Sequence, residues 1–470
     1  MNKVKLFIEN FLIYGLGGII GKLIPLIMVP IITRIMPSTE YFGISDLSNT
    51  LVSFASALAV MGMYDAMYRM FFEKDDVEYK KSICSTALVF TFFTSIIVFI
   101  ILIIFREQIA HYFFSNRKYA YIVYLSAMAT LVGATNSIVS APTRMQNQRK
   151  IYLVTNTIAP IISYGISVPM LLKGYYTIAL PLATVISGVI IEVIFGFLNR
   201  KWFNPRQFNV RLLKQMMVLA IPLLPNFLAY WIFNSCDKIM ITNMIGIGEA
   251  GIYSVGSKFG SCSQLIYMAF AGGWQYFAFA TMNEENQVKS NSLIFEYLGI
   301  ISFVVTMFVC ALSYPAFKVL FNEQYLSGYI IAPYLFLAPL LQMLFQVIGN
   351  QFLVIKKTWP TMIILSCGAC SNILINYLLI PLLGIEGASI ATLSGYIISN
   401  IVCAVVLIKK ELMFVEKRFL LATSCMVLYF IIWRLFFNNN LIIGLIVAIV
   451  MALYFSFLYK EELSFMVRLL

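Results

Sequence analysis

Residues 82–105, SICSTALVFTFFTSIIVFIILIIF, decide the fold class of this chain. The stretch runs for 24 residues without a charged side chain. A helix needs about 20 apolar residues to cross the hydrocarbon core of a bilayer. The apolar residues are continuous and do not alternate with polar ones, which disfavours a strand of a transmembrane β-barrel. The stretch therefore predicts a membrane-spanning helix.

The rest of the chain has the same character. Of its 470 residues, 61% are hydrophobic and 11% are charged, whereas a soluble domain carries about 25% charged residues. So few charges cannot cover the surface of a soluble protein of this size, which excludes a soluble enzyme, a disordered chain and a fibrous repeat. Fourteen apolar runs are long enough to span a membrane: 6–33, 41–65, 82–105, 119–143, 151–172, 175–198, 213–235, 250–282, 292–321, 328–354, 359–382, 386–408, 419–437 and 441–459. We predict an all-α polytopic membrane protein.

Basic residues indicate the orientation of these spans. If the N-terminus, the even-numbered connections and the C-terminus are cytoplasmic, those segments hold 23 of the 33 Lys and Arg, and the outer loops hold eight. Cytoplasmic loops carry an excess of Lys and Arg, so this split favours two cytoplasmic termini. The same rule accounts for the net charge of +12 without nucleic acid as a partner.

The two halves of the chain share short motifs at a nearly constant offset, which indicates an internal repeat. Gly43 and Gly251 open the second and eighth runs and lie 208 residues apart, and the pairs Ser187-Gly188 and Ser394-Gly395 lie 207 apart. Six spans in each copy make a parallel repeat, as in transporters that rock two pseudo-symmetric lobes around a central cavity. The predicted organisation is an N-terminal six-helix lobe (1–200), a cytoplasmic basic linker (201–212), a C-terminal six-helix lobe (213–410) and two additional transmembrane helices (411–470).

Charged residues inside the predicted spans are candidate functional residues, because a charge at the centre of a spanning helix costs about 2.5–3.5 kcal/mol. Lys22 and Lys258 lie beside glycines that let a helix or a ligand approach closely. Arg34 and Lys238 lie at outer ends of spans, and Asp46 is the main acid. A lumen of this composition suits an anionic head group such as a phosphate or pyrophosphate. The alternative for each lysine is to snorkel to the interface or to pair with a buried acid.

Other site chemistry is disfavoured. The chain has one histidine and eight cysteines, nearly all of the latter within apolar runs. Cys367 and Cys370 have the CxxC spacing, but no second pair accompanies them. We expect no cofactor, no metal and no catalytic residue. The aromatic-rich stretch 267–277, which includes Gln275, either lines a path for a sugar or packs at the membrane interface.

The sequence resembles the polysaccharide-repeat-unit flippases, the O-antigen and capsule (Wzx) type, of the multidrug/oligosaccharidyl-lipid/polysaccharide (MOP) exporter superfamily. The resemblance covers nearly the whole chain. It is carried by Leu23-Ile-Pro25…Pro30-Ile-Ile-Thr-Arg34-Ile-Met-Pro37…Glu40-Tyr-Phe-Gly43, by Ile221-Pro222-Leu-Leu-Pro225…Asn234-Ser-Cys-Asp237-Lys238-Ile, and by Gly251-Ile-Tyr253-Ser…Lys258.

The resemblance implies the fold shared by MOP transporters and multidrug exporters, and a flippase that moves undecaprenyl-pyrophosphate-linked oligosaccharide from the cytoplasmic to the outer leaflet by alternating access. It implies a cationic cavity at Lys22, Arg34, Asp237, Lys238 and Lys258, and coupling to an ion gradient with Asp46 as the responsive acid. Besides this substrate and membrane lipids, polymerase and chain-length components of the pathway are expected partners.

Two alternatives stay open at this point. One is an ion-coupled multidrug exporter of the same superfamily. The other is a membrane-embedded polysaccharide polymerase or ligase, which should carry polar catalytic residues on a large outer loop. The outer loops are short, and the candidate cluster for such an enzyme is Arg106, Glu107 and His111.

Overall fold

Apolar runs form long helices throughout the computed structural model, which describes residues 21, 23–282, 284–355, 357 and 359–460. Every regular element within these residues is a helix. The stretch that decides the fold class lies in α4 (Val77–Ile104). The chain forms two compact units, Met1–Gly251 and Ile252–Leu470, which we call unit 1 and unit 2.

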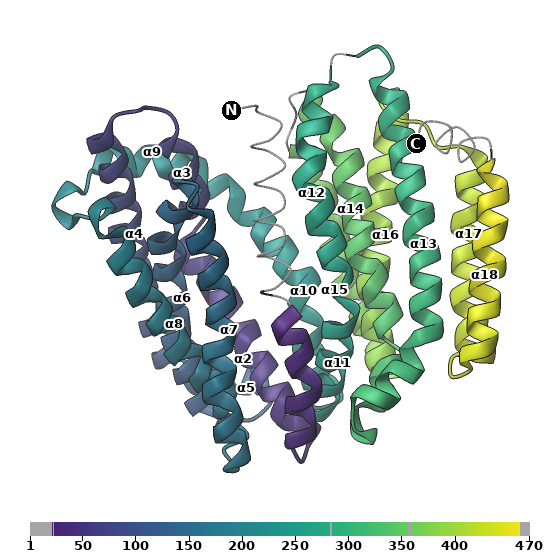
Figure 1. Cartoon of the computed structure of the whole chain (residues 1–470), viewed down its shortest axis with the longest axis horizontal. Helices are drawn as coiled ribbons and strands as arrows, with labels where there is room; N and C mark the ends of the chain where they lie inside the picture. Colours follow the sequence, from purple (N-terminus) through teal and green to yellow (C-terminus); the bar gives the residue numbers. More distant parts are fainter. Residues whose placement is uncertain (1–20, 22, 283, 356, 358, 461–470) are drawn as a thin grey trace. The chain divides into compact units, whose positions relative to one another are not determined.

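Unit 1 is built around α6, which lies against α2, α4 and α8 (Figure 1). Apolar residues of α2, α5 and α6 form one core cluster, and apolar residues of α3, α4, α6 and α9 form another. The elements of unit 1 are the helix Leu23–Ile35, α2 (Thr39–Val60), α3 (Met63–Phe71), α4 (Val77–Ile104), α5 (Arg106–Phe114), η1 (Arg117–Tyr119), α6 (Ala120–Met145), α7 (Arg149–Leu172), α8 (Ala179–Asn199), η2 (Arg200–Trp202), η3 (Pro205–Gln207), α9 (Val210–Ala220), η4 (Ile221–Leu223), α10 (Leu224–Met244) and the start of α11 (Ile247–Gly260).

Among the described residues of unit 1, two spans are bent. The axis turns by 49° between α2 and α3, where Met61 and Gly62 adopt left-handed backbone conformations. It turns by 47° between the segments Val210–Leu223 and Phe227–Met244. Pro222 and Pro225 lie at this second bend, and each removes a backbone donor that a straight helix would use. Each bent pair is long and apolar enough to cross a membrane once.

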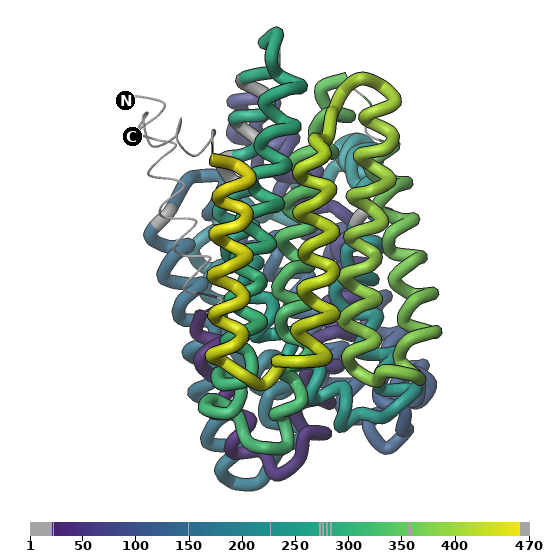
Figure 2. Tube along the Cα trace, turned by 90° about the vertical axis from the view of Figure 1, so that its right-hand side faces the viewer, coloured from purple at the N-terminus to yellow at the C-terminus, as the bar shows by residue number. Residues whose placement is uncertain are grey.

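Unit 2 is built around α14, whose residues are mostly buried, with α12, α13 and α16 against it. The two helices α17 and α18 lie side by side next to α13, as Figure 2 shows. The elements of unit 2 are the end of α11, α12 (Ser263–Ala280), α13 (Gln287–Leu320), η5 (Glu323–Tyr329), α14 (Ala332–Val354), α15 (Trp359–Leu383), α16 (Ile385–Ile408), α17 (Lys417–Ile432), the π-helical turn η6 (Trp433–Phe437) and α18 (Leu441–Leu458).

The prediction of an all-α polytopic membrane protein is confirmed. Within the described residues, ten helices are long and apolar enough to span, or twelve if each bent pair counts as one span, and these coincide with twelve of the fourteen runs. The count of fourteen is not confirmed. The run 6–33 lies mostly outside the described residues. The run 250–282 is divided between α11 and α12 by a break at residues 261–262, and α11 has only 14 residues.

Gly43 and Gly251 form a close helix contact within unit 1. A Cβ atom on Gly43 would lie 2.5 Å from the carbonyl oxygen of Ile247 and 3.1 Å from the backbone nitrogen of Gly251. The first distance is shorter than carbon and oxygen tolerate, so α2 and the start of α11 approach here because both positions lack a side chain. The glycines that mark the sequence repeat therefore have a packing role.

We expect Gly43→Val to lower the free energy of unfolding by about 1–3 kcal/mol, because an overpacked contact forces backbones apart. The measurement is the thermal unfolding temperature of the detergent-solubilised protein. Gly165→Val is the matched control, since Gly165 lies in a helix with no atom within 4 Å of an added Cβ. Equal unfolding temperatures for the two variants would contradict the proposed role of the contact.

Candidate functional site

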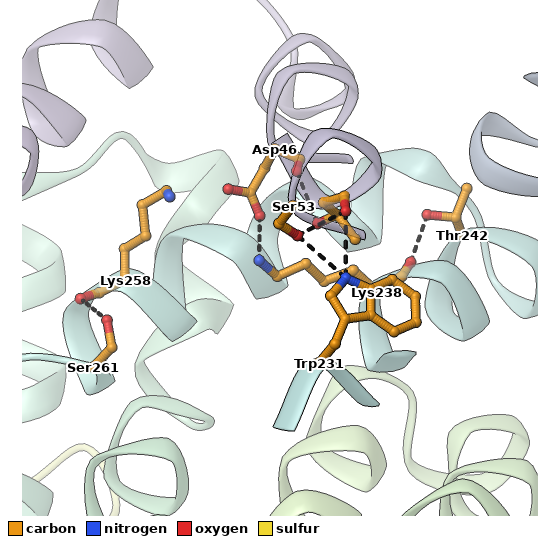
Figure 3. A network of polar contacts seen from close by, with 8 residues as sticks. Asp46, Ser53, Trp231, Lys238, Thr242, Lys258 and Ser261 are labelled. Carbon is orange, nitrogen blue, oxygen red and sulfur yellow. Dashed lines mark hydrogen bonds and ion pairs between the residues drawn. The ribbon is translucent and has the colours of Figure 1, made fainter. Parts of the chain in front are cut away.

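A buried ion pair joins two helices of unit 1. Lys238 on α10 places its Nζ 2.6 Å from Oδ2 of Asp46 on α2, and the two side chains are 13% and 4% exposed (Figure 3). The helix that carries Asp46 is fixed at its start by the Ser38 hydroxyl, which accepts a hydrogen bond from the backbone N–H of Glu40. Two charges thus meet on helices that are apolar along most of their length.

Polar groups surround this pair on the same helix faces. The Thr50 hydroxyl donates to the carbonyl of Asp46 at 3.0 Å. Trp231 Nε1 donates to the Ser53 hydroxyl at 3.2 Å, and its ring lies 4.6 Å from that of Phe54. Trp231 precedes Lys238 by two helical turns, so α10 contacts α2 through both residues. We call Asp46, Thr50, Ser53, Trp231 and Lys238 the α2–α10 polar cluster.

A buried ion pair of this kind adds little to the stability of a folded protein. Taking two charges out of water costs several kcal/mol for each ion, and their attraction recovers this only with good geometry and further hydrogen bonds. Ionisable residues inside membrane helices mark sites of function more often than sites of structure. In chemical terms, Asp46 neutralises Lys238 while no other anion is present. An anionic group that enters would compete with Asp46 for the ammonium.

The structure brings together two of the residues that the sequence singles out, Asp46 and Lys238. Asp237, the neighbour of Lys238 on α10, is 3% exposed. Arg34 is exposed at the end of the helix Leu23–Ile35. Lys258 lies on α11 in unit 2 and is half-buried, with the Ser261 hydroxyl donating to its carbonyl at 3.0 Å.

The structure describes no side chain for two further candidates. Lys22 lies outside the described residues. Gln275 lies in α12, and only its backbone is described. The roles of these two residues stay predictions from the sequence.

Sequence reasoning missed three members of the α2–α10 polar cluster, namely Thr50, Ser53 and Trp231. A signal for them was present. Thr50 and Ser53 follow Asp46 by four and seven residues, and Trp231 precedes Lys238 by seven. These spacings place each residue on the same helix face as the charged residue. A search for polar residues at helical spacing from each intramembrane charge would have found all three.

Comparison with known proteins supplies a family and a fold. The model of the family described as "Polysaccharide biosynthesis protein" matches residues 7–274. A solved structure of the lipid II flippase MurJ in an inward closed conformation matches with a TM-score of 0.68 and 16% identity, over 97% of this chain and 99% of that one. No curated protein sequence gives a significant match.

The multidrug exporters share the architecture as well. An inward-facing structure of a multidrug resistance MATE family transporter of the MOP superfamily matches with a TM-score of 0.58 and 12% identity, over 82% of this chain and 96% of that one. An outward-facing MATE structure also matches with a TM-score of 0.58, at 13% identity and over 84% of this chain and 93% of that one. The fold of this chain is therefore the one seen in the MurJ and MATE structures.

Proposed function

Because the chain belongs to the polysaccharide biosynthesis protein family, whose model covers more than half of it, we propose that it is a flippase for lipid-linked oligosaccharides. The carried lipid would be an undecaprenyl pyrophosphate bearing a repeat unit of a capsule or O-antigen polysaccharide. The observation that carries this proposal is the buried pair of Lys238 and Asp46. In this proposal a phosphate or pyrophosphate takes the place of the carboxylate beside Lys238.

The proposed cycle uses the pair as a charge exchanger. In the empty state Asp46 neutralises Lys238, which keeps the unpaired charge out of the bilayer. An entering pyrophosphate takes Lys238 as its partner and releases Asp46, which can then bind a proton or a cation. Arg34, Asp237 and Lys22 are proposed as further residues of the same cavity, Lys258 as a further cationic contact for the head group, and Gln275 as a contact for the sugar. Coupling to an ion gradient would act through Asp46.

The proposed setting is a bacterial cytoplasmic membrane with both termini in the cytoplasm. The positive residues of the predicted cytoplasmic segments support this orientation. Movement from the cytoplasmic to the outer leaflet would supply a polymerase and chain-length components, which are proposed partners. Membrane lipids surround the chain throughout.

The two alternatives have less support. A multidrug exporter shares the fold, but a cationic substrate would pair with acids left without a basic partner, whereas Asp46 already contacts Lys238. A polymerase would gather polar residues in a pocket, whereas Arg106, Glu107 and His111 of α5 are all exposed.

Reconstituted transport tests the proposal. A fluorescent undecaprenyl-pyrophosphate oligosaccharide is placed in proteoliposomes, and its arrival in the other leaflet is followed by lectin access. We expect protein-dependent flipping, and a reduction of about 10-fold in Lys258→Ala, the size expected for loss of one charge-assisted contact.

Lys289→Ala is the matched control, because Lys289 is an exposed lysine at the start of α13. Its flipping rate should equal that of the wild type. Flipping that is the same in Lys258→Ala and wild type would remove Lys258 from the site, and no flipping with several head groups would contradict the function.

A further inference from the structure

Unit 2 contains a cavity of about 620 Å³ between α14, α16 and α17, and none of its lining residues belongs to the α2–α10 polar cluster. Its walls are almost entirely apolar. The apolar side chains that line the cavity from α16 and α17 include Ile390, Leu393, Ile397, Met426 and Phe430. The aromatic contact between Tyr334 of α14 and Phe430 closes the wall between α14 and α17.

The cavity opens to the side, toward the surface that faces lipid. Three of its lining residues on α17 and η6, Val427, Ile431 and Leu435, are more than half exposed. The lining residues of α17 and η6 extend from Thr423 to Leu435. Twelve residues of helix rise about 18 Å, close to the ~15 Å depth of one leaflet. The long dimension of the cavity therefore suits acyl chains of one leaflet.

Two opposite charges line one end of this apolar space. The cation is Arg434, which is not one of the site residues predicted from the sequence. Its Nε donates to Oε1 of Glu386 at 2.7 Å. The Tyr334 hydroxyl donates to the same oxygen at 3.3 Å. Both side chains line the cavity. Among the described residues, the hydrogen bonds of this pair involve Oε1 of Glu386 and Nε of Arg434, which leaves one acceptor and several donors for a ligand.

Hydrogen bonds fix the backbone around Arg434. Arg434 lies in the π-helical turn Trp433–Phe437, and such turns occur often at functional sites. The Asn438 side chain donates to the carbonyl of Arg434 and accepts from the Tyr329 hydroxyl at 2.8 Å. The π-helical turn is thus tied to η5, and the Arg434 side chain starts from a fixed point.

We propose that this cavity binds a phospholipid with a zwitterionic ethanolamine head group as a structural ligand. The acyl chains fill the apolar space, the phosphate accepts from the terminal amino groups of Arg434, and the ammonium donates to Oε2 of Glu386. The pair is neutral overall, which disfavours a head group with net negative charge such as phosphatidylglycerol. A choline head group fits less well, because its quaternary nitrogen has no N–H to donate. The proposal is independent of the function proposed above.

Native mass spectrometry of the delipidated full-length protein tests this assignment. The probes are phosphatidylethanolamine and phosphatidylglycerol with identical acyl chains. We expect the wild type to bind the ethanolamine lipid about 10-fold more tightly, as one well-placed charged hydrogen bond would provide. Glu386→Gln should reverse the preference toward phosphatidylglycerol, because Arg434 is then unopposed. Ser394→Phe should fill the cavity and abolish binding of both lipids.

Lys318→Leu is the matched control, since Lys318 is an exposed cation near the end of α13 that does not line the cavity. It should bind as the wild type does. Equal binding of the two lipids to the wild type, or an unchanged preference in Glu386→Gln, would overturn the proposal. Displacement of the phospholipid by undecaprenyl phosphate at equal concentration, with no effect of Glu386→Gln, would instead assign the cavity to a polyprenyl chain.

Discussion

Lys238→Ala is expected to slow the flipping of a pyrophosphate-linked lipid by about 10- to 100-fold, the range for loss of a charge-assisted hydrogen bond. The variant removes the cation that faces Asp46 at 2.6 Å, and Asp46 is then left without this partner for its charge. Initial rates in proteoliposomes, normalised to the amount of folded protein, provide the measurement. Asp46→Asn should also slow transport, since Lys238 would keep its charge without a carboxylate to exchange.

A more exposed ion pair in the same unit controls for charge removal as such. Lys81 contacts Glu78 at 2.7 Å, and the two side chains are 32% and 64% exposed. Lys81→Ala should therefore transport at the wild-type rate, because surface pairs contribute little and this one lies outside the α2–α10 polar cluster. Equal losses of transport in Lys238→Ala and Lys81→Ala would show a general effect of charge and contradict the site.

The second large effect concerns stability. Lys238→Met alone is expected to lower the free energy of unfolding by about 3–5 kcal/mol, because it removes the cation that neutralises a buried carboxylate. Asp46→Leu combined with Lys238→Met should recover most of that loss, since an apolar pair of similar size needs no desolvation of charge. The double variant should nevertheless fail to transport. Unfolding temperatures in detergent, read beside flipping rates, separate the two roles.

Two results for the double variant would contradict this account. A double variant that is stable and transports at the wild-type rate would show that the ion pair serves no function. A double variant less stable than either single variant would show that the pair is a net source of stability, against the assignment of its main role to transport.

The fold class was predictable because it depends on local properties. A stretch such as 82–105 is apolar and long enough to span a membrane whatever its neighbours are, and it lies within α4. The division of the run 250–282 into α11 and α12 was not predictable from apolar length. The segment is apolar along nearly its whole length. The break between α11 and α12 depends on how the backbone packs around residues 261–262.

The site was predictable one residue at a time but not as a pair. Asp46 and Lys238 each stood out because a charge is costly inside a span. Their contact depends on the packing of α2 against α10, which connects segments far apart in the chain. Lys22 and Lys258 stood out by the same argument, yet the cost of a charge does not say which partner a lysine will find.

The segment 201–212, which the sequence predicts to be a basic linker, illustrates the same limit. The sequence indicated a cytoplasmic connection from its charges. In the structure this segment is bound to the start of α4, where the Ser82 hydroxyl donates to the carbonyl of Gln207 at 2.8 Å and the backbone of Asn204 donates to the Ser85 hydroxyl at 2.9 Å. Polar residues at the end of a spanning helix hold the linker, and no periodicity in the linker itself indicates this contact.

Head-group selectivity tests the central claim most directly. In one set of proteoliposomes, the flipping rate of a fluorescent oligosaccharide on undecaprenyl pyrophosphate is compared with that of the same oligosaccharide on uncharged undecaprenol. A site in which Lys238 exchanges Asp46 for an anion predicts that the pyrophosphate lipid flips at least about 10-fold faster, and that Lys238→Ala removes the difference. Equal rates for the two lipids in the wild-type protein would contradict the account.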